Sequence, residues 1–237
     1  MKALILAAGR GERMRPLTWI TPKPLLEAGG KPLIVWHLEK LAALGIADVV
    51  VNTAWLATTL KEALGDGDRY GVRIRYSHEG ETPLETGGAL LHARAELGED
   101  PFLLINGDIW TDYDFARLTR ASTRAAHLVM VPNPEHVARG DFHIDTSGLL
   151  HEAGEPRLTY AGLGVYRMSI LDGWRHAVEP GADTAMHPPR FPLLPLLRAA
   201  MSRHEVTGEL HAGRWTDVGT PERLADLELR LQSRSVS

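Results

Sequence analysis

The first 26 residues of this chain place the strongest constraint on its fold. Residues 3–8 form an apolar run that predicts a fully buried strand, and the run ends at Gly9 and Gly11. The loop that follows carries four cationic side chains, namely Arg10, Arg13, Arg15 and Lys23. Free backbone N–H groups in a glycine loop bind anions, and guanidinium groups match the oxygens of a phosphate. A buried strand that leads into such a loop predicts a polyphosphate site.

Two common glycine-rich phosphate loops do not match this segment. The dinucleotide-binding pattern Gly-x-Gly-x-x-Gly opens a long helix, but here its third position is Met14 and Pro16 follows. The Walker A pattern needs Gly-x-x-x-x-Gly-Lys-Ser/Thr, and no such string begins at Gly9 or Gly11. In a third interpretation the glycines only turn the chain, which explains neither the arginines nor a lysine between two prolines.

The composition excludes several classes of function. The net charge is −4, from 26 Lys and Arg against 30 Asp and Glu, so no basic field favours nucleic acid. The chain has no cysteine, which excludes disulfides and thiolate chemistry. The run at residues 3–8 is too short for a signal peptide, and no stretch approaches the roughly 20 apolar residues of a membrane span. We therefore expect a cytoplasmic protein that binds neither nucleic acid nor a membrane.

Apolar strands alternate with amphipathic helical segments through the first half of the chain. Strands are expected at residues 3–8, 47–51, 72–77, 102–109 and 128–131, and helices at 33–44, 54–64, 86–97 and 115–123. This alternation predicts an α/β protein with a parallel sheet covered by helices.

The pattern changes from about residue 140. The expected elements are an antiparallel hairpin at 142–144 and 149–151, a strand at 160–166 that returns to the main sheet, a proline-rich surface loop at 180–195, a helix at 196–201, short strands near Val206 and Trp215, and a final helix from Pro221. No linker or repeat interrupts the chain. We expect one domain over residues 1–237, with a polar hairpin or lid at about 133–160.

Two acidic residues suggest a metal ion. Asp108 ends an apolar strand, and in an open α/β sheet both Gly9 and Asp108 would lie beyond the carboxyl ends of strands, where ligands bind. A carboxylate beside a triphosphate needs an intervening cation, which points to Mg²⁺, although an Asp here also closes turns. The second acid is Asp217, and Thr220 would cap the helix that follows it whether or not Asp217 binds metal.

The N-terminal string reads Leu-x-Ala-Gly-x-Gly-x-Arg-Met-x-Pro-Leu-Thr, followed by Pro-Lys-Pro. It resembles the signature of the sugar-1-phosphate nucleotidylyltransferases. The resemblance implies a Rossmann-like, mixed but mainly parallel sheet flanked by helices, the nucleotide-diphospho-sugar transferase or GT-A-like fold. It also implies that an NTP and a sugar-1-phosphate react to give a nucleotide-sugar and pyrophosphate. The attacking phosphate is already an anion, so this reaction needs no general base.

The resemblance also implies roles for particular residues. Arg13 and Lys23 would be the catalytic cations, with Arg13 on the β- and γ-phosphates and Lys23 between the α-phosphate and the sugar phosphate. Asp108 and Asp217 would together hold Mg²⁺. The expected nucleotide-binding residues are Ala7, Ala8, Gly9, Gly11, Glu12, Arg13, Asn52, Glu85, Gly88 and Asn106. The expected sugar-phosphate residues are Lys23, Gly140, Asp141 and Gly162. Arg139 is either a solvated loop arginine or, if the sugar is a muramyl derivative, a partner for the carboxylate of its lactyl group.

The segment Leu84-Glu-Thr-Gly-Gly88 resembles the nucleobase slot of the family, or it is simply a helix N-terminus. Together with Asn52-Thr-Ala-Trp-Leu and Arg139-Gly-Asp-Phe, it is most similar to the N-acetylmuramate-1-phosphate uridylyltransferases. That subfamily implies UTP as donor, peptidoglycan recycling and a monomer. The alternatives are a guanylyl- or uridylyltransferase for mannose- or glucose-1-phosphate and, from another class, a catalytically silent sensor of nucleotide-sugars.

Overall fold

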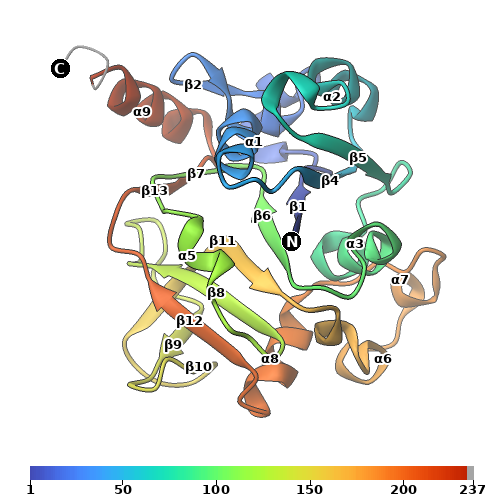
Figure 1. Cartoon of the computed structure of the whole chain (residues 1–237), viewed down its shortest axis with the longest axis vertical. Helices are drawn as coiled ribbons and strands as arrows, with labels where there is room; N and C mark the ends of the chain where they lie inside the picture. The colour runs from blue at the N-terminus through green and yellow to red at the C-terminus, as the bar shows by residue number, and fades with distance from the viewer. Residues whose placement is uncertain (234–237) are drawn as a thin grey trace.

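The computed structural model describes residues 1–233 and contains a mixed, mainly parallel β-sheet with flanking helices (Figure 1). Its strands are β1 (Lys2–Leu6), β4 (Asp48–Thr53), β5 (Arg73–His78), β6 (Phe102–Asn106), β8 (Ala126–Val131), β9 (Phe142–Ile144), β10 (Leu150–His151), β11 (Arg157–Tyr166) and β12 (Val206–Leu210). Two small sheets pair β2 (Glu27–Ala28) with β3 (Lys31–Pro32), and β7 (Ile109–Thr111) with β13 (Trp215–Asp217). The predicted fold class is confirmed.

Strand β1 shows why helices must cover both faces of the sheet. Successive side chains of a strand point to opposite faces. Ala3 and Ile5 accordingly pack into one apolar cluster, and Leu4 packs into another on the opposite face. All three side chains are fully buried. Each face of the sheet therefore needs its own apolar cover.

Helices from different parts of the chain supply these covers. One cluster includes residues of α1 (Leu33–Ala43) and α2 (Ala57–Leu64), and the other includes residues of α3 (Glu85–His92) and α8 (Leu194–Ser202). The last helix, α9 (Pro221–Gln232), packs on β2 and on the loop after β1. Thr220 caps it, with its Oγ1 accepting the Arg223 N–H at 3.4 Å, as the sequence predicts. The remaining helices are α4 (Arg94–Leu97), α5 (Ala116–Thr119), α6 (Trp174–Ala177) and α7 (Ala182–Ala185).

The strand order locates the ligand-binding edge. β4 and β5 lie in succession on one side of β1, whereas β6 lies on its other side, and all four strands are parallel. The direction of winding thus reverses at β1. Ligands in such sheets bind at the carboxyl ends of the strands next to this reversal. Here Ala7 follows the end of β1, and Asn52 and Asn106 lie in the last two residues of β4 and β6.

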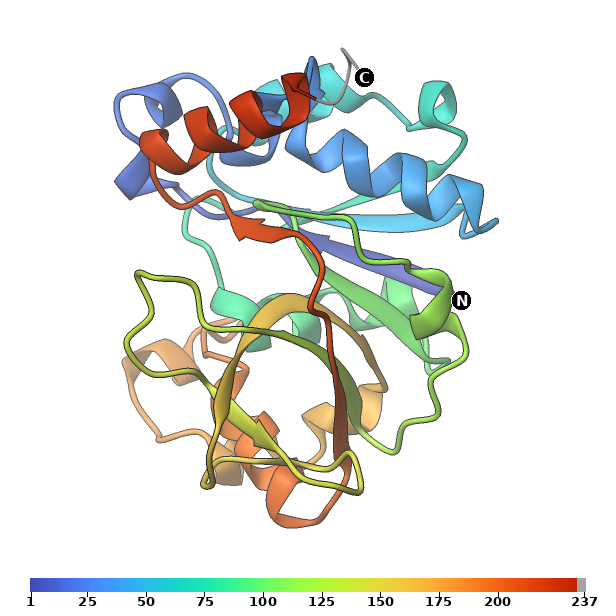
Figure 2. The same ribbon diagram turned by 90° about the vertical axis from the view of Figure 1, so that its left-hand side faces the viewer.

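The second half of the chain extends the same sheet. β11 is antiparallel to both β6 and β8, and its pairing with β8 shifts register between Tyr160 and Gly164. The start of β11 pairs instead with β9 of the predicted hairpin. Figure 2 shows β8, β11 and β12 curving together below β1 and β4. The hairpin packs against α8 and β12, so it forms part of the wall of this half of the molecule.

Several predicted elements have different bounds in the structure. The expected strand at 102–109 is interrupted because Gly107 turns over the end of β1, where its N–H donates to the Leu6 carbonyl at 2.9 Å. The expected helix at 86–97 is two helices, α3 and α4, and that at 115–123 is only the short α5. The proline-rich stretch 180–195 is more than a surface loop: it contains α7, and Phe191 is buried with its ring stacked 4.4 Å from that of Trp174.

Within residues 1–233, no helix is long and apolar enough to cross a membrane. The single-domain interpretation covers residues 1–237 and therefore includes positions outside the described range. It stays a prediction.

Candidate active site

The glycine loop after β1 is folded back on itself. It runs through three 3₁₀ turns, Glu12–Met14, Leu17–Trp19 and Lys23–Leu25, in place of the long helix of a dinucleotide-binding fold. Thr18 is buried, and its hydroxyl donates to the Gly11 carbonyl at 2.7 Å. Gly11 has φ 60°, and a Cβ there would lie 2.8 Å from Thr18 Cγ2, so this position requires glycine. The contacts between Gly11 and Thr18 therefore fix the conformation of the loop after β1.

The cations of this loop are differently placed. Arg13 is exposed and forms no ion pair with any residue from 1 to 233. The Arg15 guanidinium lies 3.4 Å from Glu12 Oε1, and that of Arg10 lies 5.9 Å from the centre of the Trp55 ring. Lys23 instead turns inward, is 11% exposed, and forms an ion pair with Asp108. Lys23 is thus the one of the four that the fold holds beside a predicted metal ligand.

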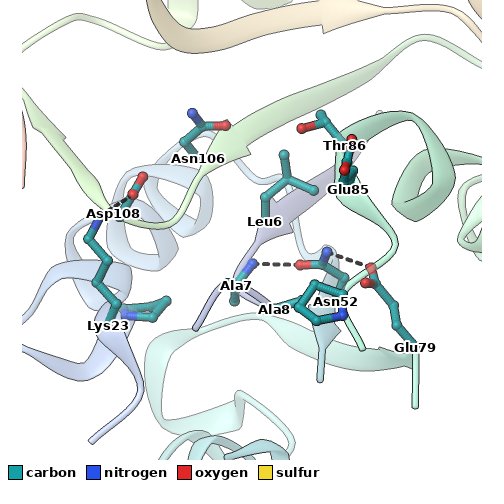
Figure 3. A pocket seen from close by; sticks show the side chains of 13 residues that line it. Leu6, Ala7, Ala8, Lys23, Asn52, Glu79, Glu85, Thr86, Asn106 and Asp108 are labelled. Atoms are coloured by element: carbon teal, nitrogen blue, oxygen red, sulfur yellow. Dashed lines mark hydrogen bonds and ion pairs between the residues drawn. The ribbon is translucent and has the colours of Figure 1, made fainter. Parts of the chain in front are cut away.

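A cavity of roughly 230 Å³ opens at the carboxyl ends of β1, β4 and β6 (Figure 3). The predicted site residues that line it are Ala7, Ala8, Gly9, Lys23, Asn52, Glu85, Asn106 and Asp108. The predicted nucleotide-binding residues outside its lining are Gly11, Glu12, Arg13 and Gly88. An added Cβ at Gly9 would meet no atom within 4 Å, so the backbone is open to a ligand there.

A chain of hydrogen bonds fixes one wall of this cavity. The Ala7 N–H donates to Asn52 Oδ1 at 2.5 Å, and Asn52 Nδ2 donates to Glu79 Oε1 at 2.7 Å (Figure 3). Glu79 Oε2 accepts the Leu84 N–H at 2.7 Å. Burial raises the pKa of Glu79, and these hydrogen bonds oppose the shift. Asn52 therefore joins the end of β1 to the residue after β5. The predicted nucleotide-binding residues did not include Glu79, and its position directly after β5 was the available signal.

The beginning of α3 meets the proline-rich segment. Glu85 has φ 61°, which is uncommon for a residue with a side chain, and its carboxylate lies 3.1 Å from Arg190 Nη2. The N–H groups of Gly87 and Gly88 both donate to the Phe191 carbonyl at 3.0 Å. A Cβ at Gly88 would lie 2.5 Å from the Pro189 carbonyl oxygen. The space beside the paired glycines is therefore filled by the protein's own chain, and contact between Gly88 and a base stays a prediction.

The small β7–β13 sheet brings the backbones of the two predicted metal ligands together, although only Asp108 lines the cavity. Asp217 pairs in register with Ile109, the residue after Asp108, and the Val218 N–H donates to the Asp108 carbonyl at 2.9 Å. Each carboxylate has a cationic partner: Lys23 for Asp108 and Arg223 for Asp217.

The donor set suits magnesium. Mg²⁺ is often held by one or two carboxylates together with substrate phosphates. Asp217 Oδ1 is buried and has no hydrogen-bond partner in the described structure, so it has free capacity to bind a cation. No cluster of three or more His, Cys, Asp or Glu side chains suited to a metal occurs between residues 1 and 233. The carboxylates therefore fit a metal ion that is shared with the substrate.

The predicted sugar-side residues fall into two groups. Gly162 lies at the irregularity in β11 with φ 71°, and a Cβ there would lie 2.5 Å from Asn106 Nδ2, so it borders a cavity residue. Gly140 and Asp141 instead fasten a loop to β11: Asp141 Oδ2 accepts the Tyr160 N–H at 2.8 Å. Neither of these two lines the cavity. Their roles, like those of the nucleotide-binding residues, stay predictions.

Comparison with known proteins gives one consistent result. The family model for nucleotidyl transferases matches residues 2–140. The chain is 45% identical over 235 residues to the N-acetylmuramate alpha-1-phosphate uridylyltransferase of Neisseria meningitidis serogroup B. The aligned region covers 96% of this chain and 97% of that protein. It is 31% identical to the mannose-1-phosphate guanylyltransferase of Mycobacterium tuberculosis over 93% of this chain, but spans only 61% of that protein.

The fold is similar to solved structures as well. A crystal structure from Bacillus anthracis with bound sucrose superposes with a TM-score of 0.81 at 24% identity, covering 98% of this chain and 95% of that one. HddC from Yersinia pseudotuberculosis, complexed with GMP-PN, superposes with a TM-score of 0.72 at 18% identity, covering 97% and 98%. At these identities the likeness concerns the fold alone. Together with the match over residues 2–140, the comparisons show that this chain belongs to the nucleotidyl transferase family.

Proposed function

We propose that this protein is a uridylyltransferase that makes UDP-N-acetylmuramate and pyrophosphate from UTP and N-acetylmuramate α-1-phosphate. The observation that supports this most strongly is the 45% identity to the Neisseria enzyme of that name, which extends over nearly the full length of both chains. The relatives named as guanylyltransferases of mannose-1-phosphate are less similar and longer. A cytoplasmic location and a place in peptidoglycan recycling accord with this proposal and stay predictions.

The chemical step is a displacement at phosphorus. A phosphate oxygen of the sugar-1-phosphate attacks the α-phosphorus of UTP, a new P–O bond forms, and the bond to the β-phosphate oxygen breaks to release pyrophosphate. Since the nucleophile is an anion, the protein's main tasks are to align the reactants and to neutralise charge. The polar side chains that line the cavity are amides, carboxylates, one threonine and one lysine, and Lys23 is the one among them that supplies positive charge.

The residues would divide these tasks as follows. The open backbone at Gly9 and the exposed guanidinium of Arg13 would bind the outer phosphates. Lys23 would leave Asp108 and bridge the α-phosphate and the sugar phosphate. Asp108 and Asp217 would hold Mg²⁺, which when bound supplies positive charge between the two phosphate groups. This division is supported by the ion pair of Lys23 with Asp108 and by the pairing of β7 with β13.

A substrate panel tests the proposal. Purified protein is mixed with each of the four NTPs and with the 1-phosphates of N-acetylmuramate, N-acetylglucosamine, glucose and mannose, and pyrophosphate release is measured. We expect the highest kcat/KM with UTP and N-acetylmuramate α-1-phosphate. Preference for GTP with mannose-1-phosphate would favour the alternative substrate pair. Binding of nucleotide-sugars without any pyrophosphate release would indicate the non-catalytic sensor.

A further inference from the structure

Arg223 reaches the site from the first turn of α9. Its backbone N–H is held by the capping Thr220, and its guanidinium extends back over Gly219 to Asp217. A Cβ at Gly219 would overlap this guanidinium, so glycine is needed for the arginine to lie there. Arg223 is 18% exposed and Asp217 is 27% exposed, which shields their ion pair from most of the solvent. Arg223 thus occupies one oxygen of a carboxylate that we assign to the metal.

His136 joins this pair from a different part of the chain. Arg223 Nη1 lies 2.7 Å from His136 Nε2, and a guanidinium can only donate. The imidazole Nε2 must therefore be the acceptor, which leaves it no proton for Asp217 Oδ1 at 3.2 Å. This assignment agrees with the lack of a hydrogen-bond partner at that buried oxygen. Arg223 is the common partner of the aspartate and the histidine.

His136 lies in the middle of residues 133–141, which we call the 133–141 loop. Both ends of the loop are fastened to β11: Asn133 Nδ2 donates to the Arg157 carbonyl at 3.0 Å, and the Asp141 N–H donates to the Leu158 carbonyl at 2.7 Å. Between these ends, His136 makes the one side-chain hydrogen bond found for residues 134–139 in the described structure. The contact with Arg223 is thus what attaches the centre of the loop to the site.

We propose that Arg223 is a positioning residue in the metal-free protein, where it orients Asp217 and, through His136, holds the 133–141 loop against the site. The ion pair between Arg223 and Asp217 breaks when a divalent cation binds. The inference rests on the metal assignment in the proposed function. It makes Arg223 the counterpart of Lys23, since each neutralises one of the two carboxylates and each becomes available when a divalent cation replaces it. Metal binding and release of the loop would then be one coupled event.

Direct metal titration tests the first half of this proposal. Mn²⁺ binding to the full chain without substrates is followed by electron paramagnetic resonance. Arg223→Gln is expected to bind Mn²⁺ about tenfold more tightly than wild type, the change that loss of one competing charge-assisted pair would produce. Arg230→Gln, which alters an exposed arginine in the last turn of the same helix, is the matched control and should bind Mn²⁺ like wild type.

Hydrogen exchange tests the second half. In wild type, amide exchange in the 133–141 loop should accelerate when Mn²⁺ is added. In Arg223→Gln and in His136→Ala it should be fast already without metal. Because coupling is reciprocal, His136→Ala should also bind Mn²⁺ more tightly than wild type, by a smaller factor than Arg223→Gln. His136→Ala alters a 42% exposed side chain and so serves as the loop test if Arg223→Gln does not fold.

The outcomes separate this inference from the metal assignment itself. Unchanged Mn²⁺ affinity in folded Arg223→Gln, or unchanged loop exchange in His136→Ala, would refute the role given to Arg223. Asp217→Asn should lose most Mn²⁺ binding. If Asp217→Asn binds Mn²⁺ like wild type, the metal site is wrong, whatever the arginine variants show.

Discussion

Replacing Lys23 by alanine is the sharpest test of the proposed chemistry. Lys23 lies between Pro22 and Pro24 in a 3₁₀ turn, so its backbone is held in place by the rings on either side. Its side chain is 11% exposed and pairs with Asp108, which is 36% exposed. The substitution removes one charge from the cavity and leaves the loop backbone intact.

The structure suggests a large effect on rate and a small one on stability. Unit charges about 4 Å apart interact by roughly 4 kcal/mol at an effective dielectric near 20, and partial screening at the cavity mouth lowers this. Turnover should therefore fall by roughly 10²–10³-fold. The unpaired Asp108 remains in contact with water, so the free energy of unfolding should fall by no more than about 1 kcal/mol.

Pyrophosphate release under saturating substrate measures the rate, and thermal unfolding measures the stability. A double variant, Lys23→Met with Asp108→Asn, assayed at a Mg²⁺ concentration that saturates Asp108→Asn, separates two explanations. If Lys23 only neutralises Asp108, removal of both charges should restore turnover relative to Lys23→Met alone. If Lys23 acts on phosphate, the double variant should remain slow. Turnover of Lys23→Ala within threefold of wild type would refute the assigned role.

Three further predictions concern the metal, the paired glycines and a buried histidine. Asp108→Asn and Asp217→Asn should each raise the Mg²⁺ concentration needed for half-maximal rate by at least about tenfold, because each removes one charged ligand of the metal. An unchanged Mg²⁺ dependence would show that the metal binds at other residues. Gly88→Ala should lower the free energy of unfolding by about 2 kcal/mol, because its Cβ would lie 2.5 Å from the Pro189 carbonyl oxygen. Gly181→Ala is the control, because no atom lies within 4 Å of its added Cβ. Equal melting temperatures for Gly88→Ala and Gly181→Ala would contradict the predicted loss of stability. Burial, with a smaller contribution from Lys40, lowers the pKa of His37 from 6.5 to about 4. The unfolded chain binds a proton at His37 more tightly than the folded protein does. The free energy of unfolding is therefore highest above pH 6.5, where His37 is neutral in both states, and falls by about 3 kcal/mol as the pH drops toward 4. Urea unfolding of His37→Gln should show a flatter profile over that range, and a profile as steep as wild type would contradict the assignment.

The sequence predicted best where periodicity and turn residues act locally. The alternation of apolar runs and helical segments is confirmed in β1, α1, β4, α2 and β5, each within a few residues. The cap at Thr220 is confirmed for the same reason, since it depends only on the adjacent residues. Where the prediction failed, a distant contact decided the result. The strand expected at 102–109 divides because Gly107 hydrogen-bonds to the end of β1, 101 positions earlier in the chain.

The site shows the same division between local and distant determinants. The carboxyl ends of β1, β4 and β6 were predictable, because parallel strands bring them to one edge. The partners of the site side chains were not. Arg190 reaches Glu85 from the proline-rich segment, the Phe191 ring fills the space beside Gly87, and the Pro189 carbonyl fills that beside Gly88. The periodicity of apolar residues does not predict such contacts, because they depend on how the second half of the chain packs against the first.

The location of the two carboxylates has a consequence for how the site assembles. Asp108 follows β6 of the main sheet, whereas Asp217 ends β13, which within residues 1–233 pairs with β7 alone, through three register positions. Its position therefore depends on few backbone hydrogen bonds, and the Val218 N–H bond to Asp108 is one of them. An aspartate placed by so short a sheet needs further contacts to fix its carboxylate. Arg223 provides that contact from α9, a helix whose Leu227 and Leu231 are buried beside Val218 and Trp110. Packing of the C-terminal helix thus holds the Asp217 carboxylate, the proposed metal ligand farthest along the chain, in place while no metal is bound.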